Sequence, residues 1–434
     1  MPHIHFNQIL VFSPITHMQM AWAQPDDEQA QGLTSPAYWQ KLAKIIESAC
    51  FDGVFFADTM SVPDDLADGA RVAMQLGAQY PRQDPFALIP IMAAVTRYLG
   101  FGVTLSTAGT PPFLAVRRLG TLDNLTGGRV AWNVVTSHVG GDFRALGLTQ
   151  LGHDERYDQA DEYMEICYRL WDAFPRDAIV ADRGKKIFVD ADRVNKVEYE
   201  GKYLKCHAYP VTMCSPQGRP LIFQAGQSGR GMHFATTHAD AIYALQPRIE
   251  SMARFVKNIR AASHDIGKTN EPKVFFGIQP VIGGTEAEAL QRRQELADAI
   301  PIEAGLNRLS GMIGIDLGKY DLDLPLENIE TNASRGLLAA TLDSIEGRAP
   351  TVREAALHWG MSYGMAQMVG TPEQIATKIE NYWRESGCYG FNISPTVSPT
   401  SIIDFAEQVV PILQKRGLMR TEYADTTFRG NLSQ

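Results

Sequence analysis

Eight short apolar segments recur along the chain, and a helix-like segment follows each of them. Most are apolar on both faces, as is typical of strands buried in a parallel sheet. The predicted strands are 3–12, 53–58, 99–107, 129–137, 220–226, 240–246, 274–282 and 389–394. Eight alternating strand and helix units favour the α/β class and, within it, a closed TIM-type (β/α)8 barrel over an open sheet.

The helices expected between these strands show amphipathic spacing and recognisable starting residues. Ser35 is a plausible cap for the first, and Pro111 and Pro112 begin the third. The fourth starts near His153 and runs to about Phe174. The first helix is 36–50. The other predicted helices are 84–97, one starting at Gly229, 249–266, 285–299 and 401–416.

Three segments interrupt the alternation, at about 59–83, 175–219 and 300–370. We treat them as insertions in a single domain spanning 1–434, because units of the barrel flank each one. Long connections of this kind are usually lids, substrate walls or oligomer contacts. Segment 300–370 is the expected lid, and a homodimer or homotetramer is the expected assembly.

The composition narrows the class of protein. The 434 residues are 45% hydrophobic and 21% charged, which is ordinary for a globular protein, and the net charge of −9 disfavours nucleic acid or an anionic membrane surface as partner. A local cationic pocket for one phosphate is still compatible with this charge. There are five cysteines without a CxxC pair, no apolar run of membrane-spanning length and no signal-peptide pattern at the start. We therefore expect a cytoplasmic protein that is not inserted in a membrane.

Polar residues gather where the predicted strands end. In a (β/α)8 barrel the active site forms at the carboxyl ends of the strands, so these residues are expected to face one ligand. They are Phe12, His17, Asp58, Thr104, Ser106, Thr107, Asn133, Thr136, Ser137, His138, Gly226, Gln227, Ser228, Gly229 and Arg230.

The segment AGQSGRG, 225–231, leads from the fifth strand into a helix. A glycine-rich turn at a helix start exposes backbone N–H groups, and the helix dipole favours an anion there. With the Ser228 hydroxyl and the Arg230 charge, a phosphate is the simplest occupant. A simple glycine turn capped by Ser228 explains the same residues equally well. Neither a dinucleotide fingerprint nor a phosphate-binding GxxxxGK[ST] loop occurs in the chain.

The remaining candidates each have a plain structural alternative. His153, Tyr157 and Asp161 share one helix face, and the first two could reach over the barrel mouth, but each alone is as readily a surface or packing residue. Asp58 could simply cap a turn, and His17 could be a packing residue in its loop. His138 alone is as readily a structural histidine. No HExxH motif supports a metal site.

Several longer motifs together resemble the bacterial-luciferase-like flavin monooxygenases. The resemblance is greatest to the two-component branch with the nitrilotriacetate and EDTA monooxygenases, dibenzothiophene-sulfone monooxygenase and the large subunit of pristinamycin IIA synthase. The motifs are FDGVFFAD (51–58), TLST and PPF (104–113), TGGRVAWNVVTS (126–137), HDERYDQADEYMEICYRLW (153–171), PLIFQAGQSGRG (220–231) and TPEQIATKI (371–379).

This resemblance implies a TIM-type barrel that binds reduced FMN from a separate NAD(P)H:flavin reductase and uses O2 as co-substrate, without a metal. It places the FMN against Asp58, Thr104 or Ser106, Ser137, His153, Tyr157 and Ser228. The phosphate would lie near Tyr157, Ser228 and the N–H groups of Gly229 and Arg230. The flavin would carry the oxidation chemistry, and the protein would position it and exclude water. His138 is the first candidate for hydrogen bonding or proton transfer, and His17 is the second.

The resemblance also implies that the substrate is a small organic molecule that is oxygenated or oxidatively cleaved. An apolar wall from Trp22, Phe12, Phe56, Phe113 and Met361 would suit a neutral heteroaromatic or sulfur-containing compound. A cationic wall from Arg71, Arg82, Lys185 and Lys186 would suit a polyanion, and we favour the neutral compound. The competing functions are an F420-dependent oxidoreductase on the same barrel, a non-catalytic flavin-binding protein and, less favoured, a metal-dependent hydrolase.

Overall fold

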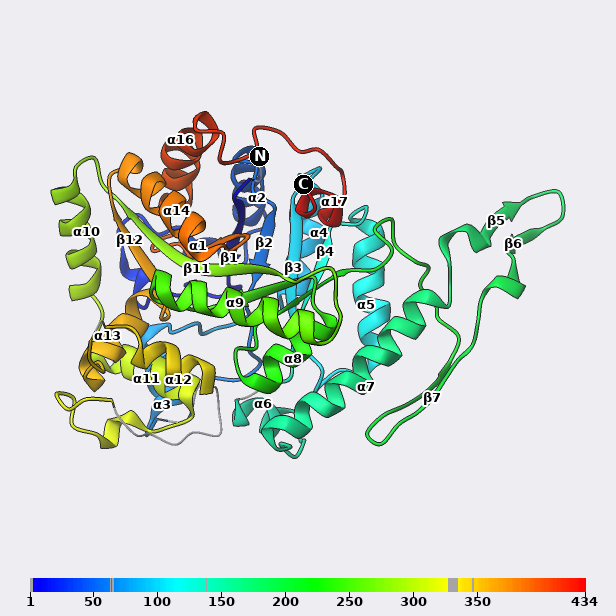
Figure 1. The fold of residues 1–434 in the computed structure, drawn as a ribbon, viewed down its shortest axis with the longest axis horizontal. Helices are drawn as coiled ribbons and strands as arrows, with labels where there is room; N and C mark the ends of the chain where they lie inside the picture. The colour runs from blue at the N-terminus through cyan, green and yellow to red at the C-terminus, as the bar shows by residue number, and fades with distance from the viewer. Residues whose placement is uncertain (1–2, 63, 65, 138, 327–334, 346) are drawn as a thin grey trace.

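The computed structural model describes residues 3–62, 64, 66–137, 139–326, 335–345 and 347–434. Within them, parallel strands form a sheet in the order β10-β9-β4-β3-β2-β1-β13-β11-β12, and pairing of β10 with β11 closes eight of them into a barrel (Figure 1). The predicted fold is thereby confirmed. The barrel strands are β1 (His5–Leu10), β2 (Gly53–Phe56), β3 (Gly100–Ser106), β4 (Val130–Val135), β9 (Leu221–Gln224), β10 (Ala241–Ala244), β11 (Lys273–Ile282) and β13 (Gly390–Ile393).

The long strand β11 has two roles. Its first half pairs with β10 and with β13, which completes the ring, and its second half pairs with β12 (Ala366–Gly370) outside the barrel. The segment that forms β12 was expected to be part of a lid insertion rather than a strand. Its pairing anchors the end of that insertion to the barrel.

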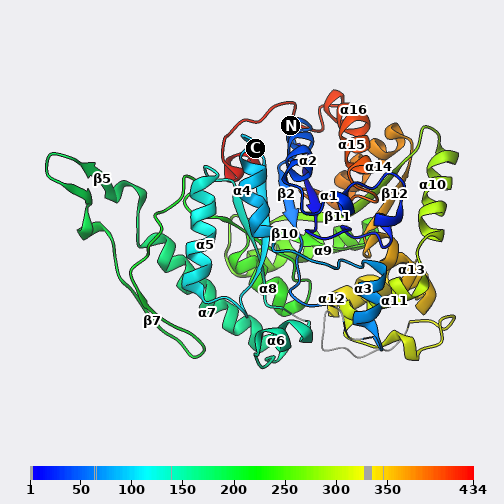
Figure 2. The same cartoon turned by 180° about the vertical axis from the view of Figure 1, so that it is seen from behind.

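The predicted helices are present and cover the outside of the barrel (Figures 1 and 2). Among the described residues, no helix is both long and apolar enough to cross a membrane. The helices are α2 (Pro36–Ser48), α4 (Leu88–Ala93), α5 (Pro112–Leu125), α7 (His153–Asp172), α8 (Gly229–His238), α9 (Ile249–Asp265), α10 (Glu286–Asp298), α15 (Thr400–Asp404) and α16 (Val410–Lys415).

One helix of the barrel layer was not predicted. α14 (Pro372–Ser386) begins at a capping box in which the Thr371 side chain accepts from the Gln374 N–H and the Gln374 side chain accepts from the Thr371 N–H. Threonine, proline and a glutamine at this spacing are a helix-start signal, so the sequence did contain the information.

The insertions carry their own secondary structure. Segment 59–83 contains α3 (Gly69–Leu76), and a further short helix, α6 (Gly140–Leu146), follows β4. Segment 300–370 contains α11 (Ile302–Ile313), α12 (Arg335–Leu342) and α13 (Val352–Ser362), which share an apolar cluster around the buried Trp359. These helices gather at the end of the barrel away from the two chain termini (Figure 1).

Segment 175–219 forms two antiparallel hairpins that extend away from the barrel (Figures 1 and 2). They are β5 (Ile179–Asp182) with β6 (Ile187–Val189) and β7 (Val197–Glu200) with β8 (Lys205–Ala208). This segment was expected to be an insertion, and no strands were assigned within it. Short hairpins whose residues are mostly exposed are hard to distinguish from a polar loop in the sequence.

The C-terminal helix α17 (Phe428–Leu432) closes the floor of the barrel, where the strands begin. Phe428 is fully buried, and its ring lies edge-on to Phe223 with a centroid separation of 5.6 Å. A Cβ atom at Gly100 would lie 2.4 Å from the Phe428 ring, and one at Gly53 would lie 2.8 Å from it. The first residues of β2 and β3 must therefore be glycines for this ring to enter.

Replacement of Phe428 by alanine should open a cavity in this floor. We expect Phe428→Ala to lower the free energy of unfolding by about 3–5 kcal/mol, as for other fully buried phenylalanines. The control is Phe188→Ala in the projecting hairpin, where the side chain is 68% exposed and the change should stay within about 0.5 kcal/mol. Urea denaturation followed by fluorescence measures both, and equal midpoints for the two variants would contradict the role assigned to Phe428.

Candidate active site

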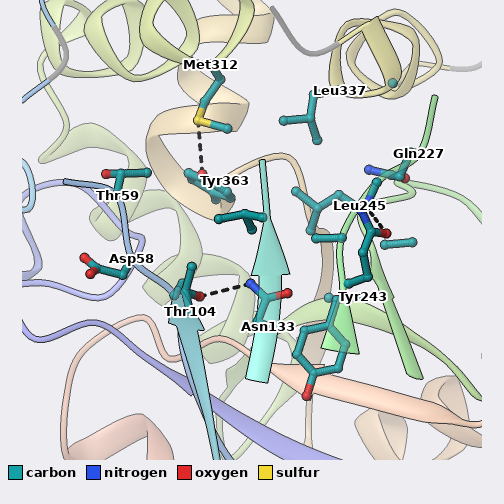
Figure 3. A pocket seen from close by; sticks show the side chains of 18 of the residues that line it. Asp58, Thr59, Thr104, Asn133, Gln227, Tyr243, Leu245, Met312, Leu337 and Tyr363 are labelled. Carbon is teal, nitrogen blue, oxygen red and sulfur yellow. Dashed lines mark hydrogen bonds between the residues drawn. The ribbon is translucent and has the colours of Figure 1, made fainter. Parts of the chain in front are cut away.

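A cavity of about 240 Å³ lies at the carboxyl ends of the barrel strands. Residues that end β2, β3, β4, β9 and β10 line it, and side chains from the 300–370 insertion lie on the side toward which the strands point (Figure 3). Seven of the predicted site residues line this one cavity: His17, Asp58, Thr104, Ser137, His153, Tyr157 and Ser228. Residues almost 400 positions apart in the sequence meet here, since Asn392 of β13 also lines this cavity.

One end of the cavity is built from the starts of two helices. Ser228 caps α8, and its Oγ accepts from the Gly231 N–H at 3.1 Å. The same oxygen lies 3.3 Å from His153 Nε2, while His153 Nδ1 contacts the Asp154 carboxylate at 2.6 Å. The Asp154 contact favours a proton on Nδ1, which leaves Nε2 to accept from the Ser228 hydroxyl.

Tyr157 also lines this end of the cavity, where it packs closely against the glycine turn that leads into α8. The ring is buried, and burial raises the pKa of the Tyr157 hydroxyl, which contacts the side chains of Gln224, Ser228 and Thr136. A Cβ atom at Gly226 or at Gly231 would lie 2.9 Å from this hydroxyl oxygen. The glycines of the 225–231 turn are thus needed for close packing as well as for the exposed N–H groups of the helix start.

Arg156 was not predicted, although it lies on the same first turn of α7 as His153 and Tyr157. Its side chain lines the cavity, it is 5% exposed, and its Nη1 donates to the Leu151 carbonyl at 2.9 Å. Its Nε is buried and has no hydrogen-bond partner among the described residues. The i, i+3 spacing from His153 was the signal that could have identified it.

The Arg230 side chain lies differently from the expectation that its charge would face a phosphate. The Arg230 guanidinium forms ion pairs with Asp158 at 3.0 Å and with Asp161, on the outer face of α7, so its charge is directed away from the cavity. Neither Arg230 nor Gly229 lines the cavity. What they offer to a ligand is confined to the backbone N–H groups at the beginning of α8.

The wall formed by β3 and β4 is a hydrogen-bonded pair of polar side chains (Figure 3). Thr104 Oγ1 donates to the Phe56 carbonyl at 2.8 Å and accepts from Asn133 Nδ2 at 3.0 Å. This fixes the orientation of the Asn133 amide. Its Oδ1 atom is buried, faces no hydrogen-bond partner within the described chain, and belongs to a residue that lines the cavity.

Ser106 and Ser137 form the next contact along this wall. The Ser137 Oγ donates to Ser106 Oγ at 2.9 Å and lies 3.2 Å from an Asp142 carboxylate oxygen. Ser137 has a φ of 49°, in the left-handed region that non-glycine residues rarely adopt, and these bonds help to hold it there. Ser106 itself lines a neighbouring cavity, not the main one.

Asp58 is a mostly buried carboxyl beside an arginine. Its Oδ1 lies 3.8 Å from Arg82 Nη1. Burial raises the pKa of Asp58 to about 7, and the nearby Arg82 charge offsets only part of that effect. The carboxyl is therefore able to change its protonation state near neutral pH.

His17 is buried and stacked on Tyr363, with ring centroids 4.4 Å apart, and its Nδ1 lies 3.0 Å from Ser394 Oγ. Burial, together with the charges of Arg308 and Arg82, holds the pKa of His17 well below its usual value. It is thus a neutral hydrogen-bonding group at physiological pH. His138, the first catalytic candidate, lies outside the described residues.

The apolar wall differs from the one expected. Phe12, Trp22, Phe56, Phe113 and Met361 do not line the cavity. The wall is formed instead by side chains of the strands and of the 300–370 insertion, namely Phe55, Tyr243, Leu245, Met312, Leu337, Tyr363 and Met365. Sequence reasoning missed the insertion residues because nothing in a long connection shows which of its faces turns inward. Among the described residues, no group of three histidine, cysteine or acidic side chains is placed to hold a metal ion.

Comparison with known proteins identifies the family of this chain. The family model described as luciferase-like monooxygenase matches residues 9–389. Dimethyl-sulfide monooxygenase of Hyphomicrobium sulfonivorans is 36% identical over 95% of this chain and 86% of its own length, and dibenzothiophene-sulfone monooxygenase of Rhodococcus erythropolis is 37% identical over 96% of this chain and 94% of its own length. A solved structure of riboflavin lyase with modified FMN and the substrate riboflavin has a TM-score of 0.91, with 32% identity, 100% of this chain covered and 96% of that chain.

The family inferred from the motifs is confirmed by these matches, which extend over nearly the whole chain. With a barrel whose strand ends converge on one polar cavity, and with a family model spanning residues 9–389, the chain belongs to the luciferase-like monooxygenases.

Proposed function

We propose that this chain is the oxygenase component of a two-component system that binds reduced FMN and uses O2 to oxygenate or oxidatively cleave a small organic substrate. One observation carries the proposal. An anion-binding end, made by the start of α8 with Ser228, His153 and Arg156, and a hydrogen-bonding wall, made by Thr104 and Asn133, line the same cavity. FMN has a phosphate at one end and a ring with N–H and carbonyl groups at the other, which this arrangement would satisfy.

Two unpartnered atoms support the fit of this cofactor. The buried Nε of Arg156 is a donor at the end where the phosphate would lie, and the buried Oδ1 of Asn133 is an acceptor on the wall where the ring would lie. A buried polar atom without a partner costs about 1–3 kcal/mol, so a ligand that pairs with both would recover that free energy on binding. Asp58, Ser137 and the N–H groups of Gly229 and Arg230 would make further contacts, while Ser106 would act through Ser137.

The chemistry divides between cofactor and protein. When bound, reduced FMN would supply the two electrons for activation of O2, which is the source of the oxygen atom transferred to the substrate. The protein would orient the ring against β3 and β4, hold the phosphate at α8, and exclude water with Met312, Leu337 and Tyr363 of the insertion. His17 would act as a neutral hydrogen-bonding group beside the cavity, since its pKa is held low. His138 stays the first candidate for proton transfer on sequence grounds.

The proposal also covers the partner protein, the domain organisation, the assembly and the location of the enzyme. The chain has no dinucleotide fingerprint, so we infer that a separate NAD(P)H:flavin reductase supplies the reduced FMN. We further propose a single barrel domain with insertions, assembled as a homodimer or homotetramer in the cytoplasm.

A coupled assay tests the function. The protein is incubated with FMN, NADH, a flavin reductase and O2, and candidate organosulfur and heteroaromatic compounds are screened by mass spectrometry for the gain of one oxygen or for a cleaved product. Controls lacking either the reductase or this protein should give no such product. Reduced F420 is titrated in parallel, and tight binding of F420 with no binding of FMNH2 would contradict the proposal.

Ser228→Ala should weaken binding of FMNH2 by about 1–3 kcal/mol, because a buried hydrogen bond to the phosphate end is lost. Anaerobic fluorescence titration measures the affinity. The matched control is Thr285→Ala, which removes the capping threonine of α10 outside the cavity. Both variants lose a helix cap, and only Ser228→Ala should lose affinity. Equal affinities in the two variants would remove Ser228 from the phosphate site.

Asp58 predicts a specific pH dependence of stability. Its folded-state pKa of about 7 lies above the ordinary value of 3.8, so folding favours the protonated carboxyl, and stability decreases as pH rises between these two values. Relative to wild type, Asp58→Asn should therefore gain stability as pH increases from about 4 to 7, by a total of about 2–4 kcal/mol. Urea denaturation of the ligand-free protein at a series of pH values measures the difference.

The comparison variant for this series is Asp425→Asn. Hydrogen bonds from Thr427 lower the pKa of Asp425, so its contribution to stability is lost as pH falls, and the difference from wild type should have the opposite sign. Parallel pH profiles for wild type and Asp58→Asn would show that the Asp58 carboxyl is not destabilised by burial.

A further inference from the structure

A second, smaller cavity of about 60 Å³ adjoins the main one. His17, Asp58 and Tyr363 line both cavities, so the two spaces are adjacent at these side chains. Two arginines line this smaller cavity, Arg82 from the loop after α3 and Arg308 from α11. Its volume leaves room for a group of only a few atoms.

Arg308 is a buried cation that forms no ion pair with any acidic side chain among the described residues. The residue is 6% exposed, and its Nε and Nη2 atoms have no hydrogen-bond partner in the described part of the chain. Its guanidinium carbon lies 5.1 Å from the centroid of the Tyr363 ring, which provides a cation–π contact but does not satisfy the N–H donors. Burial and the neighbouring Arg82 lower the pKa of Arg308 to about 10, so the side chain remains charged at neutral pH.

Arg82 differs from Arg308 in having its donors occupied. It donates to the Thr59 carbonyl at 3.1 Å, to Thr59 Oγ1 and to Gln79 Oε1, and it lies 3.8 Å from Asp58. It therefore contributes positive potential to the cavity without depending on a ligand. The acidic groups near it are both accounted for, because Asp58 has its pKa raised toward neutrality and Asp142 accepts from the N–H and Oγ of Ser61 at 2.9 and 2.7 Å.

An unpaired buried guanidinium is costly, and the cost is recovered when an anion binds to it with several hydrogen bonds. We propose that the smaller cavity is a substrate subsite, in which Arg308 binds a carboxylate or similarly small anionic group of the substrate, with Arg82 reinforcing the positive potential. The oxidisable part of that substrate would extend past His17 and Tyr363 into the main cavity. The substrate assignment rests on the proposed monooxygenase function, whereas the anion site itself does not.

This subsite changes the substrate class expected from the sequence. The expected substrate changes from a neutral compound, heteroaromatic or sulfur-containing, to a small organic acid. That acid can still contain sulfur. Of the arginines and lysines considered for a cationic wall, only Arg82 takes part, because Arg71 lies on α3 outside both cavities and Lys185 and Lys186 lie in the projecting β5–β6 hairpin. Arg308 supplies the group that the sequence did not reveal.

Equilibrium binding tests the subsite without catalysis. Linear carboxylates from acetate to hexanoate, each beside its primary amide, are titrated into the protein by calorimetry, with and without saturating FMN. For at least one chain length we expect the acid to bind about tenfold or more tightly than the amide, which is the gain typical of a charge-assisted hydrogen bond. FMN is expected to leave this preference intact, because the phosphate end lies elsewhere in the main cavity.

Three variants assign the preference to Arg308. Arg308→Gln should abolish the difference between acid and amide, and Arg308→Lys should keep part of it, since the charge is retained and the planar donor array is lost. The matched control is Arg384→Gln, which removes an exposed arginine of α14 and should keep the wild-type ratio. Affinity for FMN should be the same in all three variants and in the wild type.

The result that would overturn the subsite is an equal affinity for every acid and its amide, or an acid preference that persists in Arg308→Gln. If Arg308→Gln does not fold, crystals of the wild type soaked with 3-bromopropanoate decide, since anomalous scattering locates the bromine. A bromine peak beside Arg308 supports the proposal, and a peak elsewhere or none contradicts it. Loss of FMNH2 binding with retention of acid binding would instead reject the flavin function and leave the anion site standing.

Discussion

Closure of the parallel sheet is the constraint on which the rest of this structure depends. Strand β11 hydrogen-bonds to β10 on one side and to β13 on the other, and β13 in turn pairs with β1, so the first and last barrel strands are fixed to each other. Because all eight strands point the same way, every strand end lies on one rim. The polar residues that follow these strands then share a cavity however far apart they are in the chain.

The two ends of the barrel differ in how completely they are packed and hydrogen-bonded. At the floor, Phe428 packs against the first residues of β2 and β3, and glycines at these positions allow its close contact. At the rim, Arg156, Asn133 and Arg308 keep buried polar atoms without partners in the described chain. Unmet hydrogen-bonding capacity lowers the stability of the ligand-free protein, and it is the same capacity that a cofactor and a substrate would use. Stability thus comes from one end of the barrel and specificity from the other.

The fold and the site could be predicted from the sequence to different extents. Strand–helix alternation was enough for the barrel, because buried parallel strands are apolar on both faces and their order along the chain is their order around the ring, apart from insertions. Asp58, Thr104, Ser137 and Ser228 were found because they lie at or close after strand ends, and His153 and Tyr157 were found from their helix spacing and motif. Arg156 had a readable spacing that was overlooked. Arg308 could not be found this way, since it lies on a helix within an insertion, and only the packing of α11 against the barrel shows that its side chain faces inward.

The hairpins and β12 illustrate the same limit. Their segments are short and have no strong hydrophobic period, so their structure is set by contacts with distant parts of the chain. Arg230 shows a further difficulty, because a cation beside a glycine turn looks like a phosphate ligand until its ion pairs with Asp158 and Asp161 are seen. Local sequence identifies a helix start, while the direction of each side chain depends on the neighbouring helix.

The pairing of β1 with β13 also affects how the protein is made. The Gln8 side chain donates to the carbonyl of Ile393, 385 positions later in the chain, so one edge of β1 has no partner until β13 emerges from the ribosome. At elongation rates of about 5–20 residues per second, that delay is roughly 20–75 s. During this interval the nascent chain exposes an unprotected strand edge to its neighbours. Completion of the ring is therefore a late event in the synthesis of this chain.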